Sequence, residues 1–167
     1  MKLLLINEVC GHTSTGKICA NIADEYSLKG WEVKIAYGRD GYVPEIYKKY
    51  SVRIGHDFDV RIAALQVRLL DNAGLANKNA TKKFVEWMED FKPDLIWLHN
   101  LHGYYINIEL LFEWLKAHPN IEKRWTLHDC WTFTGHCTHF EMIDCNRWKR
   151  GCYNCTQKKR YPKSLFL

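Results

Sequence analysis

The sequence predicts an α/β fold in which helices cover both faces of a mainly parallel sheet. Short apolar runs of strand length alternate with stretches whose apolar residues recur at helical spacing. Strands that alternate with helices favour parallel pairing, because each helix carries the chain back to the start of the next strand. We therefore expect a three-layer sandwich of helix, sheet and helix.

The first half of the chain begins with KLLLI at residues 2–6, a continuously apolar run typical of a buried strand. Apolar residues then recur every four positions, which predicts a helix from about Gly16 to Lys29 that stops at Gly30. WEVKIAYG at residues 31–38 alternates like a second strand, and SVRIG at residues 51–55 is a candidate for a third.

The next part of the chain repeats the alternation. Amphipathic patterns predict helices over residues 60–70 and 84–91, and DLIWLHN at residues 94–100 is the fourth strand. Asn107 is placed to cap a helix that carries Ile108, Leu111 and Leu115. KRWTLHD at residues 123–129 supplies the fifth strand.

Three polar segments lie at or just after the ends of predicted strands. These segments are the loop from Cys10 to Gly16, the stretch HNLHGYY from His99, and HDCW from His128. In open parallel sheets, ligands bind beyond the carboxyl ends of the strands. We therefore expect these three segments to meet at one edge of the sheet and to form the binding site.

Length and composition predict one ordinary globular domain. The chain has 167 residues, of which 47% are apolar and 26% charged. No apolar run approaches the ~20 residues of a membrane span, and the first ten residues are too short and too soon acidic for a signal peptide. We expect a cytoplasmic protein with a domain at residues 1–129 and a Cys-rich segment at residues 130–167, where the periodic pattern disappears.

The opening loop, GHTSTGKI at residues 11–18, partly fits the phosphate-binding signature G-x-x-x-x-G-K-[ST]. Ile18 replaces the Ser or Thr whose hydroxyl would bind magnesium, which argues against a nucleotide hydrolase. What remains is a small-residue turn into a helix, whose free amides favour an anion or a hydroxyl-rich ligand. The alternative is a tight turn with Thr13, Ser14 or Thr15 as the helix cap.

Three histidines, His99, His102 and His128, lie where the ligand rule places a site. Histidine suits proton transfer and hydrogen bonding to sugar hydroxyls or phosphate oxygens. The alternative for each is a structural histidine that satisfies buried backbone groups. A zinc site made of the three stays open, although they lack the i, i+4 spacing that would argue for it.

Five of the seven cysteines lie within 26 residues, a density that favours metal binding in a cytosolic protein. Four of them are the predicted ligands of a structural zinc: Cys137, Cys145, Cys152 and Cys155. Cys130, His136 and His139 are further candidates. Only one C-x-x-C pair is present, so buried free thiols are the main alternative. An iron–sulfur cluster or a redox pair ranks below both.

The end of the chain is basic. From Cys145 onward there are seven Lys or Arg and no Asp or Glu, so the net charge of +5 belongs to this tail. A basic run of this kind can be a solvated face, a surface for anionic lipid headgroups, or a nucleic-acid contact. We rank the three in that order.

The order of INEVCGHTSTGKI, PDLIWLHNLHGYYINIELL and the block WTLHDCWTFTGHC to RYPKS resembles the amino-terminal part of bacterial family 4 glycosyltransferases of the polysaccharide-biosynthesis type. The resemblance covers nearly the whole chain. It implies the amino-terminal half of a GT-B fold, a Rossmann-like domain that binds the acceptor and faces a second domain for the nucleotide-sugar donor.

The resemblance also implies roles for individual residues. His128 matches a family histidine close to the transferred sugar, and Asp129 follows it. The substrate-binding residues expected in the loop after the first strand are Thr13, Ser14, Thr15 and Gly16. Asn100 and His102 would lie on the acceptor side. The family retains anomeric configuration without a catalytic metal, so any zinc at the cysteines would be structural.

One departure concerns the donor half. The family's E-x7-E pattern does not occur before the chain stops at SLFL. A GT-B enzyme forms its transition state between two domains, so we expect the isolated chain to have little or no transferase activity. The alternative to the enzyme is a non-enzymatic zinc-knuckle module that binds nucleic acid or an anionic membrane surface.

Overall fold

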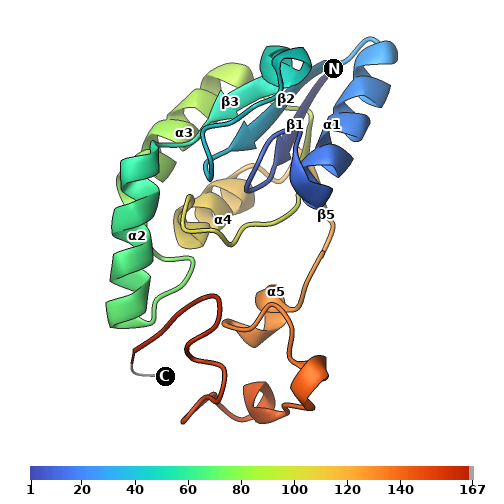
Figure 1. Cartoon of the computed structure of the whole chain (residues 1–167). Coiled ribbons are helices and arrows are strands. Elements are labelled where there is room, and N and C mark those ends of the chain that lie inside the picture. The colour runs from blue at the N-terminus through green and yellow to red at the C-terminus, as the bar shows by residue number, and fades with distance from the viewer. Residues whose placement is uncertain (166–167) are drawn as a thin grey trace.

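The structure of the protein is a computed structural model that describes residues 1–165. Its centre is a five-stranded, all-parallel sheet with strand order β3-β2-β1-β4-β5 (Figure 1). The strands are β1 (Lys2–Ile6), β2 (Glu32–Tyr37), β3 (Ser51–Arg53), β4 (Leu95–Leu98) and β5 (Glu122–Trp125). The prediction of an α/β fold with a parallel sheet is confirmed.

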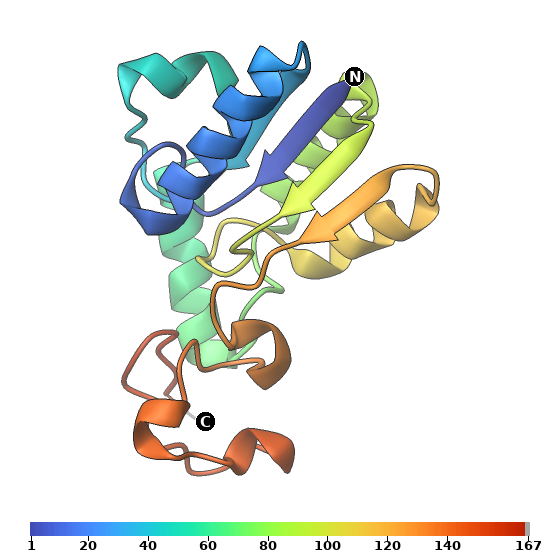
Figure 2. The same ribbon diagram turned by 90° about the vertical axis from the view of Figure 1, so that its right-hand side faces the viewer.

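Helices cover both faces of the sheet (Figure 2). They are α1 (Thr13–Leu28), α2 (Asp57–Leu70), α3 (Lys78–Phe91), α4 (Ile108–Ala117) and the short α5 (Trp131–Thr134), with 3-10 turns η1 (Glu45–Tyr50), η2 (Glu141–Ile143) and η3 (Arg147–Lys149). Within the described residues, the part after α5 holds only these last two turns as regular structure, which agrees with the loss of periodicity there.

Strand β1 shows why its run of apolar residues is continuous. Leu3 and Leu5 pack with Cys19 and Ala23 of α1 on one face of the sheet. Leu4 and Ile6 pack on the other face, with side chains from α3 and α4 that include Phe84, Met88, Leu111 and Trp114. All four β1 side chains are fully buried, because a central parallel strand has helices above and below it.

The start of α1 differs from the sequence prediction. The helix begins at Thr13 rather than near Gly16, and its N-cap is His12, whose side chain makes no capping hydrogen bond. The alternative that Thr13, Ser14 or Thr15 caps the helix is therefore wrong. By contrast, Asn107 caps α4 as predicted, because its Oδ1 accepts a hydrogen bond of 3.0 Å from the Leu110 N–H.

The structure explains why the opening loop has glycine at positions 11 and 16. Gly11 has a φ of +74°, and its N–H donates to the Gly16 carbonyl at 3.2 Å. A Cβ on Gly16 would lie 3.0 Å from the Val9 side chain and 3.3 Å from the Gly11 nitrogen. The loop is thus folded tightly against the first turn of α1, and this packing accounts for the glycine spacing without a phosphate.

Candidate functional site

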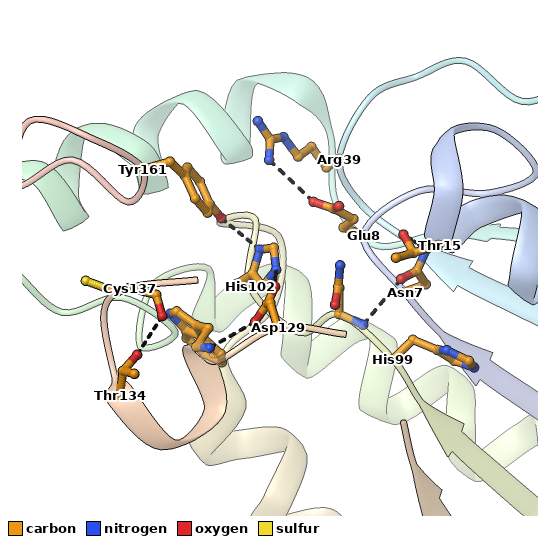
Figure 3. A network of polar contacts seen from close by, with 12 residues as sticks. Asn7, Glu8, Thr15, Arg39, His99, His102, Asp129, Thr134, Cys137 and Tyr161 are labelled. Carbon is orange, nitrogen blue, oxygen red and sulfur yellow. Dashed lines mark hydrogen bonds and ion pairs between the residues drawn. The ribbon is translucent and has the colours of Figure 1, made fainter. Parts of the chain in front are cut away.

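The polar segments after β1, β4 and β5 meet at the carboxyl edge of the sheet, as predicted (Figure 3). The three strands are neighbours in the order β1-β4-β5. Strands β2 and β3 lie on one side of β1, and β4 and β5 lie on the other. The strand order therefore reverses between β1 and β4, and the carboxyl ends of these two strands form the topological switch point of the sheet. Parallel pairing brings the ends of strands far apart in sequence together here.

Asn7, the residue after β1, ties the first loop to the end of β4. Its Nδ2 donates to the Val9 carbonyl at 2.8 Å and to the Thr15 hydroxyl at 3.3 Å. Its Oδ1 accepts the Asn100 N–H at 3.3 Å. Asn7 is fully buried and Asn100 nearly so, which makes this contact a fixed part of the site.

His99 and His128 form a pair across β4 and β5. Nδ1 of His99 lies 2.9 Å from Nε2 of His128, and the two rings lie edge to edge, with centroids 5.2 Å apart and an interplanar angle of 18°. The Trp97 ring stacks against His99, and the His99 carbonyl accepts the indole N–H of Trp125 at 3.1 Å. His99 is buried and His128 is partly exposed, so His128 is the member of the pair that a ligand can reach.

Both imidazoles of this pair are held in the neutral form. Burial, with a smaller contribution from the neighbouring His128, lowers the pKa of His99 from 6.5 to about 4. Burial also lowers the pKa of His128, against the opposing attraction of the Asp129 carboxylate. Near neutral pH the pair therefore offers hydrogen-bonding nitrogens rather than positive charge.

A second polar chain runs beside the first, from Asp129 through His102 to Tyr161. His102 Nε2 lies 2.6 Å from Asp129 Oδ2, and His102 Nδ1 lies 3.0 Å from the Tyr161 hydroxyl. The other carboxylate oxygen of Asp129 accepts the Trp131 N–H at 2.9 Å. Both ring nitrogens of His102 are thus occupied, which fixes the orientation of the imidazole.

Burial raises the pKa of Asp129, but the hydrogen bonds from His102 and the Trp131 N–H outweigh it and lower the pKa overall. Asp129 is therefore ionised near neutral pH. Burial raises the pKa of Tyr161, so its hydroxyl keeps its proton and can donate to His102. In this arrangement His102 Nε2–H donates to Asp129, and Tyr161 O–H donates to His102 Nδ1.

Glu8 and Arg39 border the same edge. Arg39 lies 3.4 Å from Glu8 in an ion pair and sits over the Tyr161 ring, 5.5 Å from its centroid. Gly103, with a φ of +114°, passes close to both, and a Cβ there would lie 3.3 Å from the Glu8 carboxylate. The chain between β4 and α4 is thereby held against the loop after β1.

Thr13, Ser14 and Lys17 lie at the start of α1 with exposed side chains, whereas Thr15 and Gly16 are buried. The structure therefore splits the predicted loop residues. Thr13 and Ser14 are available to a ligand together with the free amides of the first turn. Thr15 serves the Asn7 contact, and Gly16 serves the packing of the helix against the loop.

The predicted zinc ligands lie in the tail, away from the strand ends. Together with Phe140 and Trp148, the four tail cysteines line one cavity of about 10 Å³: Cys137, Cys145, Cys152 and Cys155. Burial raises the pKa of Cys137 to about 11, and the three neighbouring thiol groups make smaller contributions in the same direction. None of the seven cysteines forms a disulfide.

In residues 1–165, no three or more His, Cys, Asp or Glu side chains are arranged so that they could hold a metal ion. The chemistry of four thiols around one cavity fits zinc, but their arrangement is not that of a formed site. Zinc at the tail cysteines therefore stays a prediction.

Sequence reasoning missed Asn7 and Tyr161. Asn7 follows an apolar strand directly, as Asn100 closely follows β4, and this position was a usable signal. Tyr161 lies 59 residues from His102 in a segment without periodicity, and no local pattern connects the two. Only the folding of the tail back onto the domain brings them together.

Comparison with known proteins gives one relevant similarity. The chain is 36% identical over 74 residues to an Escherichia coli (strain K12) protein named "Putative colanic acid biosynthesis glycosyl transferase WcaC". The match covers 42% of this chain and only 18% of that relative. No family model matches the chain. No solved structure matches it. Part of this chain is therefore similar to part of a protein named as a glycosyl transferase of colanic acid biosynthesis.

Proposed function

We propose that this chain is the acceptor-side domain of a GT-B glycosyltransferase of family 4, which moves a sugar from a nucleotide-sugar donor to a glycan or lipid-linked acceptor in cell-surface polysaccharide synthesis. The observation that carries the proposal is the strand-end cluster, in which His128 and the His102–Asp129 pair lie at the switch point of a parallel sheet. The partial similarity to a glycosyl transferase supplies the class of reaction.

In this proposal His128 contacts the sugar that is transferred, and His99 sets its tautomer. Among the residues that the structure describes, Nε2 of His99 is buried and has no hydrogen-bond partner. A buried N–H without a partner costs more free energy than a buried ring-nitrogen lone pair without one. The proton of His99 therefore belongs on Nδ1, where it donates to His128 Nε2. His128 then carries its own proton on Nδ1 and offers that N–H to a sugar hydroxyl.

Asp129 and His102 have a different task. His102 has no free ring nitrogen while Tyr161 is in place, so it acts on the substrate through Asp129 rather than by direct contact. It holds the carboxylate ionised and oriented next to His128. We expect Asp129 and Asn100 to line the acceptor side, with His102 as a positioning residue.

The start of α1 faces the donor. A nucleotide-sugar carries a diphosphate, and the free amides of the first helical turn stabilise a negatively charged group at an exposed site by about 0.3–1 kcal/mol. Thr13 and Ser14 add hydroxyl donors, and the Lys17 ammonium is exposed on the same turn. This set of donors would stabilise the departing diphosphate without a catalytic metal.

The proposal requires a second, donor-binding domain. The match spans 18% of the relative's length, so most of that protein has no counterpart in the matched part of this chain. Because the transition state of a GT-B enzyme lies between two domains, this chain by itself should give little or no turnover.

The test is a transfer assay on the enzyme that contains this domain together with a donor half. Radiolabelled UDP-glucose, UDP-galactose, GDP-mannose and GDP-fucose are offered in turn with a membrane lipid extract. The proposal predicts that label from one donor enters the lipid or glycan fraction. The absence of transfer from all of them, with release of free sugar no faster than in the buffer, would argue against it.

The alternative of a nucleic-acid module is tested on the chain alone. Binding to single- or double-stranded oligonucleotides that weakens steeply with salt would favour it, since each phosphate contact contributes to the salt slope. We expect no such binding at physiological salt.

A further inference from the structure

Helix α2 presents its larger apolar side chains to solvent. Phe58, Ile62, Leu65 and Leu69, the α2 stripe, are 70%, 50%, 59% and 44% exposed. Their spacing of four, three and four residues puts them in one line along the helix. Single exposed apolar residues are ordinary, but a continuous line of four on one helix marks an interaction surface.

The opposite side of α2 already makes the contacts that hold the helix on the domain. Ala63 and Val67 are 1% exposed and pack with Ala76, and Val60 packs against the main core. The small residues thus face inward and the large ones outward, the reverse of what a solvated helix needs. The α2 stripe is therefore not part of the fold's own core.

Basic groups lie along one flank of the stripe. Arg61 and Arg68 are exposed on α2. The acidic residues near the start of the helix are already engaged, because Asp57 pairs with Arg53 and Asp59 accepts the His56 N–H. Arg61 and Arg68 therefore supply positive charge beside the stripe, whereas Asp59 keeps its negative charge in the first turn and Asp71 lies at the C-cap of α2.

The basic tail joins this surface at the end of α2 (Figure 1). The Leu165 N–H donates to the Arg68 carbonyl at 3.1 Å. Leu65, Arg68 and Lys163 line one hollow of about 370 Å³ together with Tyr161. The tail contributes Lys158, Lys159, Arg160 and Lys163 within six residues, with no acidic residue among them. An apolar line and a basic rim thus form one continuous face.

We propose that the α2 stripe and the basic tail dock together on an anionic membrane surface. An interfacial helix buries its apolar side among the headgroups and places Lys and Arg at the phosphate level, which is the pattern seen here. A second copy of the chain is a poorer occupant, because a twofold contact through this face would bring the two basic rims together. No helix in residues 1–165 has the length and hydropathy of a bilayer-spanning segment.

The surface adjoins the candidate site. Tyr161 lines the same hollow as Leu65 and also hydrogen-bonds His102. Docking would therefore place the strand-end cluster next to the lipid headgroups, where a lipid-linked acceptor presents its glycan. This last step rests on the proposed function, whereas the docking itself does not.

The experiment is sedimentation of the chain with vesicles, without any sugar donor. We expect the wild-type chain to sediment with vesicles of phosphatidylglycerol and phosphatidylcholine in equal parts, and not with phosphatidylcholine alone. The double variant I62S/L65S should have a partition coefficient onto these vesicles more than tenfold below that of the wild type. The partition coefficient of K158Q/K159Q/K163Q should also be lower, and its difference from the wild type should shrink as salt is added. The matched control L28S/I46S removes two exposed apolar side chains elsewhere and should bind as the wild type does.

Each variant is checked for folding by its thermal unfolding midpoint, which surface substitutions should leave nearly unchanged. The proposal fails if the wild-type chain stays in the supernatant with anionic vesicles, or if I62S/L65S binds as well as the control. It also fails if gel filtration shows a dimer that I62S/L65S converts to a monomer. If the chain binds vesicles but the enzyme that contains this domain transfers no sugar from any donor, that result would instead count against the proposed function.

Discussion

Replacement of His99 should remove a specific part of the acid sensitivity of the fold. His99 is 2% exposed, and its pKa lies near 4 in the folded chain against 6.5 in the unfolded chain. Above about pH 7.5 the imidazole is neutral in both states and contributes almost nothing to the pH dependence. As the pH falls from 6.5 toward 4, only the unfolded chain takes up the proton, so stability is lost.

The size of the effect follows from the pKa difference. At ~1.36 kcal/mol for each unit of pKa, complete passage through this range costs about 3 kcal/mol. Between about pH 7.5 and pH 4.5 most of it, roughly 2.5 kcal/mol, should be lost. That is a large share of the 5–15 kcal/mol typical of a domain.

The assay is urea unfolding followed by tryptophan fluorescence at the two pH values. His99→Gln keeps a donor for His128, and His99→Phe keeps the ring that stacks on Trp97. Both should lose less free energy of unfolding on acidification than the wild type, by about 2.5 kcal/mol. Titrating groups that do not contact His99 cancel in the comparison, and the two variants differ in whether they keep a hydrogen-bond donor for His128. Equal pH dependence in wild type and both variants would refute the reasoning.

Three further outcomes are expected. Gly38→Ala should destabilise the fold by about 1–3 kcal/mol in urea unfolding, because a Cβ would lie 2.6 Å from Cδ2 of the fully buried Tyr105; an unchanged midpoint would contradict this packing. Asn107→Ala should cost about 1 kcal/mol in the same assay through loss of the α4 cap. We propose that the tail cysteines bind one zinc as a structural metal, so the purified chain should contain near-stoichiometric zinc, lost in Cys152→Ser but not in Cys130→Ser; less than about 0.2 equivalents in carefully handled protein would count against it.

The sheet could be predicted from the sequence because its pattern is local. Each strand is a short apolar run, and each crossover helix shows its own apolar stripe. The same logic located the strand-end segments, since parallel strands end at one edge whatever their separation in sequence. The Asn107 cap was equally local, because the residue and the amide that it satisfies are three positions apart.

The rest depended on contacts that no local pattern encodes. Tyr161 reaches His102 only because the tail folds back onto the domain. The opening loop matched most of a phosphate signature, yet Gly11 and Gly16 are required by tight packing. The α2 pattern located the helix but not its exposed stripe, because periodicity alone does not say which side faces the core.

The central claim is that His128 contacts the transferred sugar, and initial rates of transfer by the enzyme that contains this domain test it most directly. His128→Ala should lower kcat by about a hundredfold or more, while its thermal unfolding midpoint stays near that of the wild type. His118→Ala, at the end of α4, is the control and should keep most of the activity. Turnover by His128→Ala that equals the wild-type rate would remove His128 from the site and contradict the account.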